Sequence, residues 1–223
     1  MNKLWVFGDS MSCNHNKWIL DDPNKFVWPE IVAESLNLEL INKATIAIGN
    51  DTIIKTLSNN LWKIEPSDRV IIGLTNPIRY KVQIEGQNQD MPFYLQSNHP
   101  NKKLKEILFN FHNNIIVRAH DELLKDYYTQ VINIQKVLTK QKTQSLIWSW
   151  YAQVLDDTLE NYAYKGEFNM YDRLEDGHFS YLGHEQFANN ILSVLEKNIG
   201  LLTSFTNKDD SGLFVWKDLK PLI

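Results

Sequence analysis

The chain has 223 residues, of which 43% are hydrophobic, and this combination suits one large domain with a sizeable core. Its formal net charge of -4 argues against a nucleic-acid partner, because phosphate binding needs clustered Lys and Arg side chains. The single cysteine, Cys13, excludes an internal disulfide and any metal site built from several cysteines.

The first half of the chain alternates apolar runs with amphipathic segments. Leu4–Phe7 is a continuous apolar run, typical of a strand buried on both faces. Pro29 predicts the start of a helix, since proline suits the first helical position, and residues 38–44 predict a second strand. From Asn50 onward, apolar residues recur at every fourth position and predict another helix. Residues 68–75 combine a charged start with Val-Ile-Ile-Gly, and give the strongest strand signal in the chain.

The second half begins with an irregular, proline-interrupted segment at about residues 77–110, which we interpret as an insertion. Residues 116–138 predict a long helix, and residues 145–151 predict a fourth strand. Apolar residues between 187 and 195 recur at helical spacing and predict a last helix. The C-terminal tail, about residues 200–223, carries aromatic side chains, and we expect it to pack on the body of the protein.

The order of these elements predicts the fold class. Strands alternate with helices, which is the pattern of a parallel sheet with helices on both faces. We therefore expect a single three-layer α/β/α domain over residues 1–223. In such sheets, ligands bind at the carboxyl ends of the strands, so the loops that follow the strands are where functional residues are expected.

Neither a membrane span nor a signal peptide is expected from the sequence. No apolar run approaches the roughly 20 residues of a membrane helix. The first ten residues contain no separate apolar segment of the kind that a signal peptide requires. We expect a cytoplasmic protein on these grounds.

A candidate nucleophile and a candidate base stand near opposite ends of the chain. Gly-Asp-Ser ends the first predicted strand at Ser10, and a serine hydroxyl becomes a nucleophile when a neighbouring base takes its proton. That base is typically a histidine oriented by a carboxylate. Of the six histidines, His178 stands out, because Glu175 and Asp176 lie just before it on the same loop. Asp9 points away from Ser10 on an extended chain, and we expect it to brace the loop.

Donors for a negatively charged reaction intermediate are also available at the strand ends. Ester hydrolysis develops negative charge on the carbonyl oxygen, which fixed N–H donors must stabilise. Gly49 follows the second predicted strand and opens a helix, where free backbone N–H groups point outward. Asn76, after the third predicted strand, offers a side-chain amide, and the Ser10 backbone N–H is a further donor.

Four sequence blocks resemble, in order and spacing, the SGNH hydrolases, which are also called GDSL-type esterases and lipases. The blocks read FGDSMS, NKATIAIGNDTI, VIIGLTNP and EDGHFSYLGHEQFA. The resemblance runs to about residue 195 and leaves out the insertion and the tail. It implies a flavodoxin-like sheet, Ser10 as nucleophile and His178 as general base. It also implies an oxyanion hole made by the Ser10 N–H, the Gly49 N–H and an Asn side chain, with no metal or organic cofactor.

Two positions depart from the family pattern. The third block usually has Asn two residues after Gly, but here Thr75 holds that position and Asn76 comes one residue later. Either Asn76 reaches the oxyanion hole from a shifted loop, or Thr75 donates a weaker hydroxyl hydrogen bond, or the hole has two backbone donors. The last block usually has Asp three residues before His, where this chain has Glu175, with Asp176 two residues before His. We favour Asp176 as the acid, with Glu175 as the alternative.

The leading interpretation is a serine esterase that hydrolyses a small carboxylic ester, such as a sugar O-acetyl ester, through an acyl-serine intermediate. One alternative is a catalytically weak or inactive domain of the same fold that binds a carbohydrate or another partner. Another is an acyltransferase that uses the same serine. Trp148, Trp150, Tyr151 and Phe179 are candidate walls for the substrate, although core packing is favoured for the two tryptophans.

Overall fold

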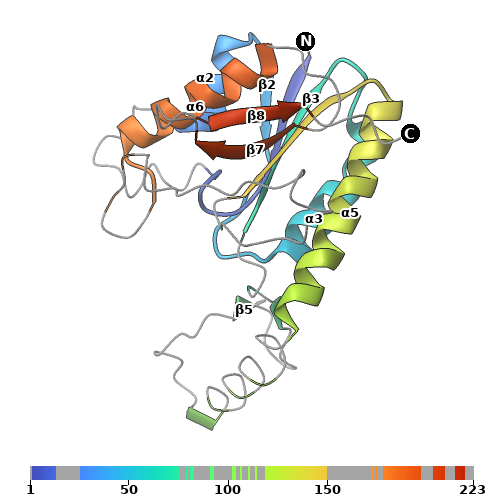
Figure 1. Cartoon of the computed structure of the whole chain (residues 1–223), viewed down its shortest axis with the longest axis vertical. Helices are drawn as coiled ribbons and strands as arrows, with labels where there is room; N and C mark the ends of the chain where they lie inside the picture. Colours follow the sequence, from blue (N-terminus) through green and yellow to red (C-terminus); the bar gives the residue numbers. More distant parts are fainter. Residues whose placement is uncertain are drawn as a thin grey trace.

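The computed structural model has a central sheet covered by helices on both faces (Figure 1). The residues that the structure describes are 2–13, 26–75, 79, 81–82, 91–92, 102–103, 106, 110, 114, 119–149, 172, 174, 178–196, 203–208 and 214–218. The strands of the main sheet are β1 (Lys3–Phe7), β2 (Glu39–Asn42), β3 (Arg69–Leu74), β6 (Gln144–Ser149), β7 (Thr203–Lys208) and β8 (Phe214–Asp218). Across the sheet they lie in the order β2-β1-β3-β6-β7-β8.

The pairing of the strands is parallel from β2 to β7 and antiparallel between β7 and β8. The predicted parallel sheet is therefore confirmed for β1, β2, β3 and β6. The tail, which we expected only to pack on the body, contributes two strands to the sheet edge. Thr203–Lys208 reads Thr-Ser-Phe-Thr-Asn-Lys, and a segment with one apolar residue lacks the continuous run that marks a strand in a buried parallel sheet.

Within the described residues, each face of the sheet is covered by two helices. On one face lie α2 (Trp28–Ser35) and α6 (Tyr181–Glu196), and on the other lie α3 (Asn50–Ser58) and α5 (His120–Lys140) (Figure 1). A 3-10 turn, η1 (Leu61–Lys63), leads into β3. The helix predicted at Pro29 is confirmed, and its start is closed by the Val27 N–H donating to the Glu30 carboxylate at 3.1 Å. Among the described residues, no helix combines the length and the apolar character that a membrane span needs.

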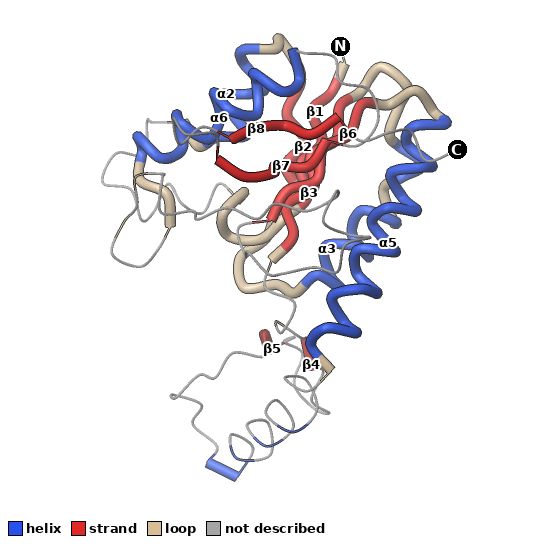
Figure 2. Tube along the Cα trace, in the orientation of Figure 1, coloured by secondary structure: helices blue, strands red, loops and turns tan. Residues whose placement is uncertain are grey.

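Within the predicted insertion, the described residues include two short strands. These are β4 (Lys81–Val82) and β5 (Met91–Pro92), which pair antiparallel as a separate two-stranded sheet. In Figure 2 they lie beyond the end of the main sheet where β3 ends, near the start of α5. These two short strands therefore lie beyond the carboxyl edge of the main sheet.

Alternation along the strands divides the core into two layers. Leu4 and Val6 of β1 face the cluster that includes Trp28 of α2, whereas Trp5 and Phe7 face the cluster beneath α3 and α5. On the α2–α6 side, the rings of Trp28, Trp148 and Phe187 pack against one another, with centroids 4.7 to 5.9 Å apart. Core packing, the interpretation favoured for Trp148, is confirmed, since this residue is 1% exposed. Trp150 and Tyr151 lie outside the described residues.

A buried carboxylate ties the amino end of β1 to the turn before β3. Asp68 is 2% exposed. It accepts hydrogen bonds from the Lys3 N–H at 2.8 Å, the Trp5 indole N–H at 2.8 Å and the Glu65 N–H at 3.0 Å. Hydrogen bonds to a charged group are the stronger kind, and three of them satisfy a carboxylate that would otherwise be expensive to bury.

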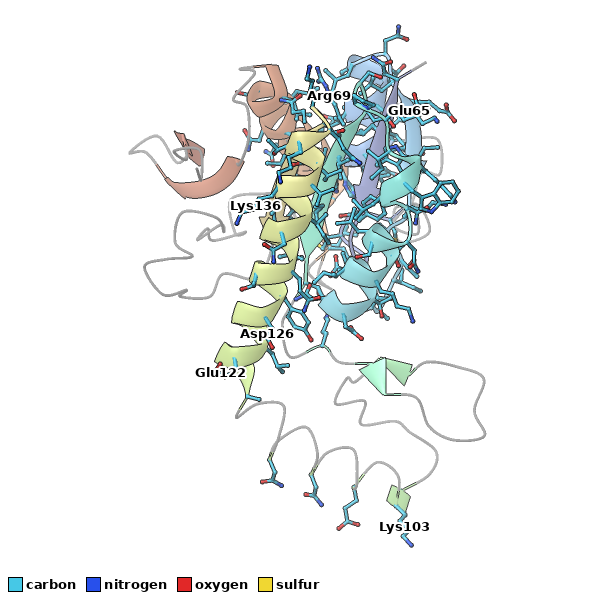
Figure 3. All side chains as sticks on the ribbon, turned by 90° about the vertical axis from the view of Figure 1, so that its right-hand side faces the viewer. Glu65, Arg69, Lys103, Glu122, Asp126 and Lys136 are labelled. Atoms are coloured by element: carbon cyan, nitrogen blue, oxygen red, sulfur yellow. The ribbon has the colours of Figure 1, made fainter. Side chains whose placement is uncertain are left out.

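Replacement of Asp68 by alanine is expected to lower the free energy of unfolding by about 3 kcal/mol, because it leaves one buried and two partly buried donors without an acceptor. Urea unfolding at neutral pH measures this change. The matched control is Asp126→Ala on the exposed face of α5 (Figure 3), with an expected change within about 0.5 kcal/mol. Equal stability losses in the two variants would contradict the role given to Asp68.

The strand order reverses direction at β1. From β1 the chain passes through α2 to β2 on one side, and through α3 to β3 on the other side of β1. Such a reversal of strand order leaves a crevice outside the carboxyl ends of the two central strands. Ser10 follows β1 and Thr75 follows β3, so both stand at the carboxyl ends of these two strands.

Candidate active site

Ser10 occupies a tight turn directly after β1. The turn is closed by the Ser12 N–H, which donates to the Asp9 carbonyl at 3.0 Å. The Asp9 carboxylate accepts the Met11 N–H at 3.1 Å, so this side chain holds the turn from inside. The prediction that Asp9 braces the loop is confirmed. Gly8 packs closely on the turn, because a Cβ there would lie 2.7 Å from the Ser12 hydroxyl oxygen and would displace that side chain.

Ser10 differs from its neighbours in exposure. The residues from Leu4 to Asp9 and from Met11 to Cys13 are buried, whereas Ser10 is partly exposed. Its hydroxyl oxygen lies 3.0 Å from Nε2 of His178, a residue 168 positions later in the chain. The structure therefore brings the two predicted residues within hydrogen-bond distance.

His178 is held by the start of α6. The backbone carbonyl of His178 accepts the Leu174 N–H at 2.9 Å, and the next residue, Phe179, is fully buried against Phe187. Ser180 caps α6, since its hydroxyl oxygen accepts the Gly183 N–H at 3.2 Å. A buried aromatic and a helix cap on one side, and a backbone hydrogen bond on the other, hold the backbone of His178 in place.

The carboxylate expected to orient His178 is not placed by the structure. Glu175 and Asp176 both lie outside the described residues. Asp172, a nearby acid that is described, accepts a short hydrogen bond from the Ser180 hydroxyl. The carboxylate of Asp172 thus supports the start of α6.

Gly49 stands at the start of α3, as predicted, and a larger residue would not fit there. A Cβ at Gly49 would lie 2.1 Å from the carbonyl oxygen of Arg79. The requirement for glycine is one of space, because its φ of -93° is open to any residue. As the residue before the first helical turn, Gly49 stands where backbone N–H groups have no partner within the helix.

Asn50 joins the start of α3 to the end of β3. Its side-chain amide donates to the Thr75 carbonyl at 2.9 Å, and its side-chain oxygen accepts the Thr75 N–H at 2.8 Å. The Thr75 hydroxyl is buried and has no hydrogen-bond partner within the described part of the chain. Its burial weighs against the alternative in which this hydroxyl meets a substrate oxygen. Asn76, the other alternative, lies outside the described residues.

Two polar residues at the site were not singled out by the sequence as functional. His184 is fully buried on α6, and Arg79, in the insertion, pairs with Asp9 at 2.9 Å. The sequence carries a weak signal for His184, which follows Ser180 by one helical turn. It carries none for Arg79, because the insertion is irregular and its partner is 70 residues away.

His184 is a neutral histidine next to the candidate base. Its Nδ1 accepts the Trp28 N–H at 3.3 Å, which satisfies a donor at the first turn of α2. Burial, and then the charge of His178, lower the pKa of His184 to about 3. His184 is therefore uncharged at neutral pH.

The low pKa of His184 predicts a pH-dependent stability. In the unfolded chain a histidine titrates near 6.5, so on acidification the unfolded state binds this proton first and folding stability falls. The contribution is complete above about pH 6.5 and is lost progressively down to about pH 3. Between about pH 7.5 and about pH 5, His184→Gln should lose about 2 kcal/mol less of its unfolding free energy than the wild type. Urea unfolding at both pH values measures this, and parallel losses would contradict it.

Comparisons with known proteins give remote likenesses in structure. No family model matches the sequence, and no curated protein matches it. A lipase/acylhydrolase from Enterococcus faecalis is similar at 13% identity and a TM-score of 0.46, over 89% of this chain and 97% of that one. An acetyl xylan esterase from Butyrivibrio proteoclasticus is similar at 10% identity and a TM-score of 0.45, over 89% and 64%. A family two carbohydrate esterase from Clostridium thermocellum, solved with cellohexaose, is similar at 16% identity and a TM-score of 0.40, over 89% and 65%.

Proposed function

We propose that this chain, which resembles the SGNH hydrolases in its four motif blocks, is a serine esterase. The proposed reaction is hydrolysis of a small carboxylic ester through an acyl-serine intermediate. The observation that carries the proposal is the 3.0 Å distance between the Ser10 hydroxyl oxygen and Nε2 of His178. The two residues come from opposite ends of the sequence and meet at the topological switch point, where doubly wound sheets bind ligands.

In the first half of the proposed reaction, the Ser10 oxygen attacks the ester carbonyl carbon while its proton passes to Nε2 of His178. The carbonyl oxygen becomes negatively charged in the tetrahedral intermediate. The backbone N–H groups of Ser10 and Gly49 are the proposed donors to it, with Asn76 as the proposed side-chain donor. The alcohol then leaves with the proton from His178, and the acyl group stays on Ser10.

In the second half, water replaces the alcohol. His178 takes a proton from the water, whose oxygen attacks the acyl carbon, and the acid is released as the proton returns to the Ser10 oxygen. In the proposal, Asp176 or Glu175 orients the imidazole. An acyltransferase would run the same first half and use another hydroxyl in place of water.

Covalent labelling tests the proposal directly. A serine-directed fluorophosphonate is expected to add once per chain, on Ser10, and to block hydrolysis of p-nitrophenyl acetate. Hydrolysis rates of p-nitrophenyl butyrate and p-nitrophenyl octanoate then measure how long an acyl chain the site accepts. The rate on an acetylated sugar measures whether the site accepts a sugar as the alcohol. The matched control is Ser12→Ala, which removes a buried hydroxyl two residues from Ser10 and should label normally. A chain that neither labels nor hydrolyses any of these esters would contradict the proposal and favour a binding domain.

A further inference from the structure

Arg79 contacts both halves of the proposed site. Its guanidinium Nη1 donates to Oδ2 of Asp9 at 2.9 Å, directly beside Ser10 in the sequence. Its backbone carbonyl oxygen packs against Gly49, in the space that a Cβ would occupy. One residue from the insertion therefore contacts the turn that carries the nucleophile and the glycine proposed as an oxyanion donor.

The contact with Asp9 is a partly buried, charge-assisted hydrogen bond. The Asp9 side chain is 2% exposed and that of Arg79 is 19% exposed. The second carboxylate oxygen of Asp9 accepts the Met11 N–H, so Arg79 and the nucleophile turn share the same carboxylate. In a site of low dielectric such a bond is stronger than at the surface, and loss of one partner leaves the other charge buried.

The contact with Gly49 holds the backbone of Arg79 against the start of α3. Gly49 is also linked to the end of β3, because the neighbouring Asn50 amide holds the backbone of Thr75 on both sides. Thr75 and Arg79 thus each contact the start of α3. The Arg79 guanidinium, through its hydrogen bond to Asp9, connects the start of α3 to the turn at Ser10.

We propose that Arg79 is a positioning residue that sets the spacing between Ser10 and Gly49. The inference rests on the proposed function, since this spacing matters only if Ser10 attacks a carbonyl whose oxygen Gly49 stabilises. A misplacement of about 1 Å between reacting groups can reduce a rate about 100-fold. Arg79 does not contact the reacting atoms in this proposal, so its removal should reduce kcat more than it changes KM.

The test compares kcat, KM and the fluorophosphonate labelling rate in wild type, Arg79→Gln, Asp9→Asn and the double variant. We expect Arg79→Gln to lower kcat and the labelling rate about 10- to 100-fold, with KM within about threefold. The kcat of the double variant should be no lower than that of the more impaired single variant, because each single substitution already removes the same contact. Arg79→Lys keeps the charge without the planar fork and should recover part of kcat.

The matched control is Arg69→Gln. Arg69 is a partly buried arginine at the first residue of β3, at the end of the sheet away from Ser10 (Figure 3). Its replacement should leave kcat per labelled site unchanged. If wild type is active and Arg79→Gln behaves as this control does, the inference about Arg79 is overturned and the esterase stands. A lower melting temperature with unchanged kcat per labelled site also overturns it.

Two further outcomes are decisive. If Arg79→Gln does not fold, Arg79→Lys is used in its place. A wild-type kcat in Arg79→Lys, together with an effect of Asp9→Asn on kcat that is the same in the wild-type and Arg79→Lys backgrounds, overturns the inference. A wild-type chain without labelling or esterase activity overturns both the inference and the proposed function.

Discussion

Replacement of Ser10 by alanine is expected to lower kcat/KM for p-nitrophenyl acetate by about 10⁴-fold or more, because it removes the only group proposed to bond to the substrate. Alanine leaves the backbone N–H of residue 10 in place. Residual activity should therefore reflect the oxyanion donors and substrate binding alone. Steady-state rates against the uncatalysed background measure the loss.

The Ser10 variant should fold as wild type does. The side chain is partly exposed, and His178 is its partner in the structure, so its loss should change the free energy of unfolding by about 0.5 kcal/mol or less. Ser12→Ala serves as the activity control. Rates in Ser10→Ala that equal those of wild type would remove Ser10 from the mechanism.

Replacement of His178 by glutamine is the second large effect. Glutamine keeps a hydrogen-bonding group near the Ser10 hydroxyl but cannot take its proton, so we expect a loss of about 10³- to 10⁶-fold in kcat. The labelling rate by fluorophosphonate should fall with it, since labelling needs the same activated serine. Substrate binding should change little, and KM within about fivefold separates this effect from a damaged pocket.

The combination of the two variants sharpens the test. Residues that act as one unit have strongly non-additive effects, so Ser10→Ala with His178→Gln should be no slower than the slower single variant. Multiplied losses would show that the two residues act independently. In that case the 3.0 Å contact would be structural, and the base would have to be found elsewhere.

The sequence allowed the central strands and the meeting of Ser10 with His178 to be predicted. Leu4–Phe7 and Val70–Leu74 are buried on both faces of the sheet, and each is a run without polar side chains. The meeting of Ser10 and His178 followed from fold class, since loops at the carboxyl edge of one sheet must approach one another. Both features depend on sequence patterns that extend over several residues.

What could not be predicted depends on single contacts between distant segments. The Arg79–Asp9 pair joins residues 70 positions apart, and nothing in the local sequence of either marks the other. Asn50 looked like a polar neighbour of Gly49, and its role as a clamp on Thr75 depends on the register of α3 against β3. The first strand of the tail lacked a signal because only one residue in Thr203–Lys208 is apolar.

The Asp68 network lies at the amino end of β1 and β3, whereas Ser10 and Thr75 follow the carboxyl ends of the same two strands. Changes at well-separated positions usually add in free energy. Substitutions that re-shape the loops around Ser10 for a new ester could therefore be combined with stabilising changes around Asp68 without either set disturbing the other. Directed evolution of this chain can treat the opposite edges of its sheet as separate libraries.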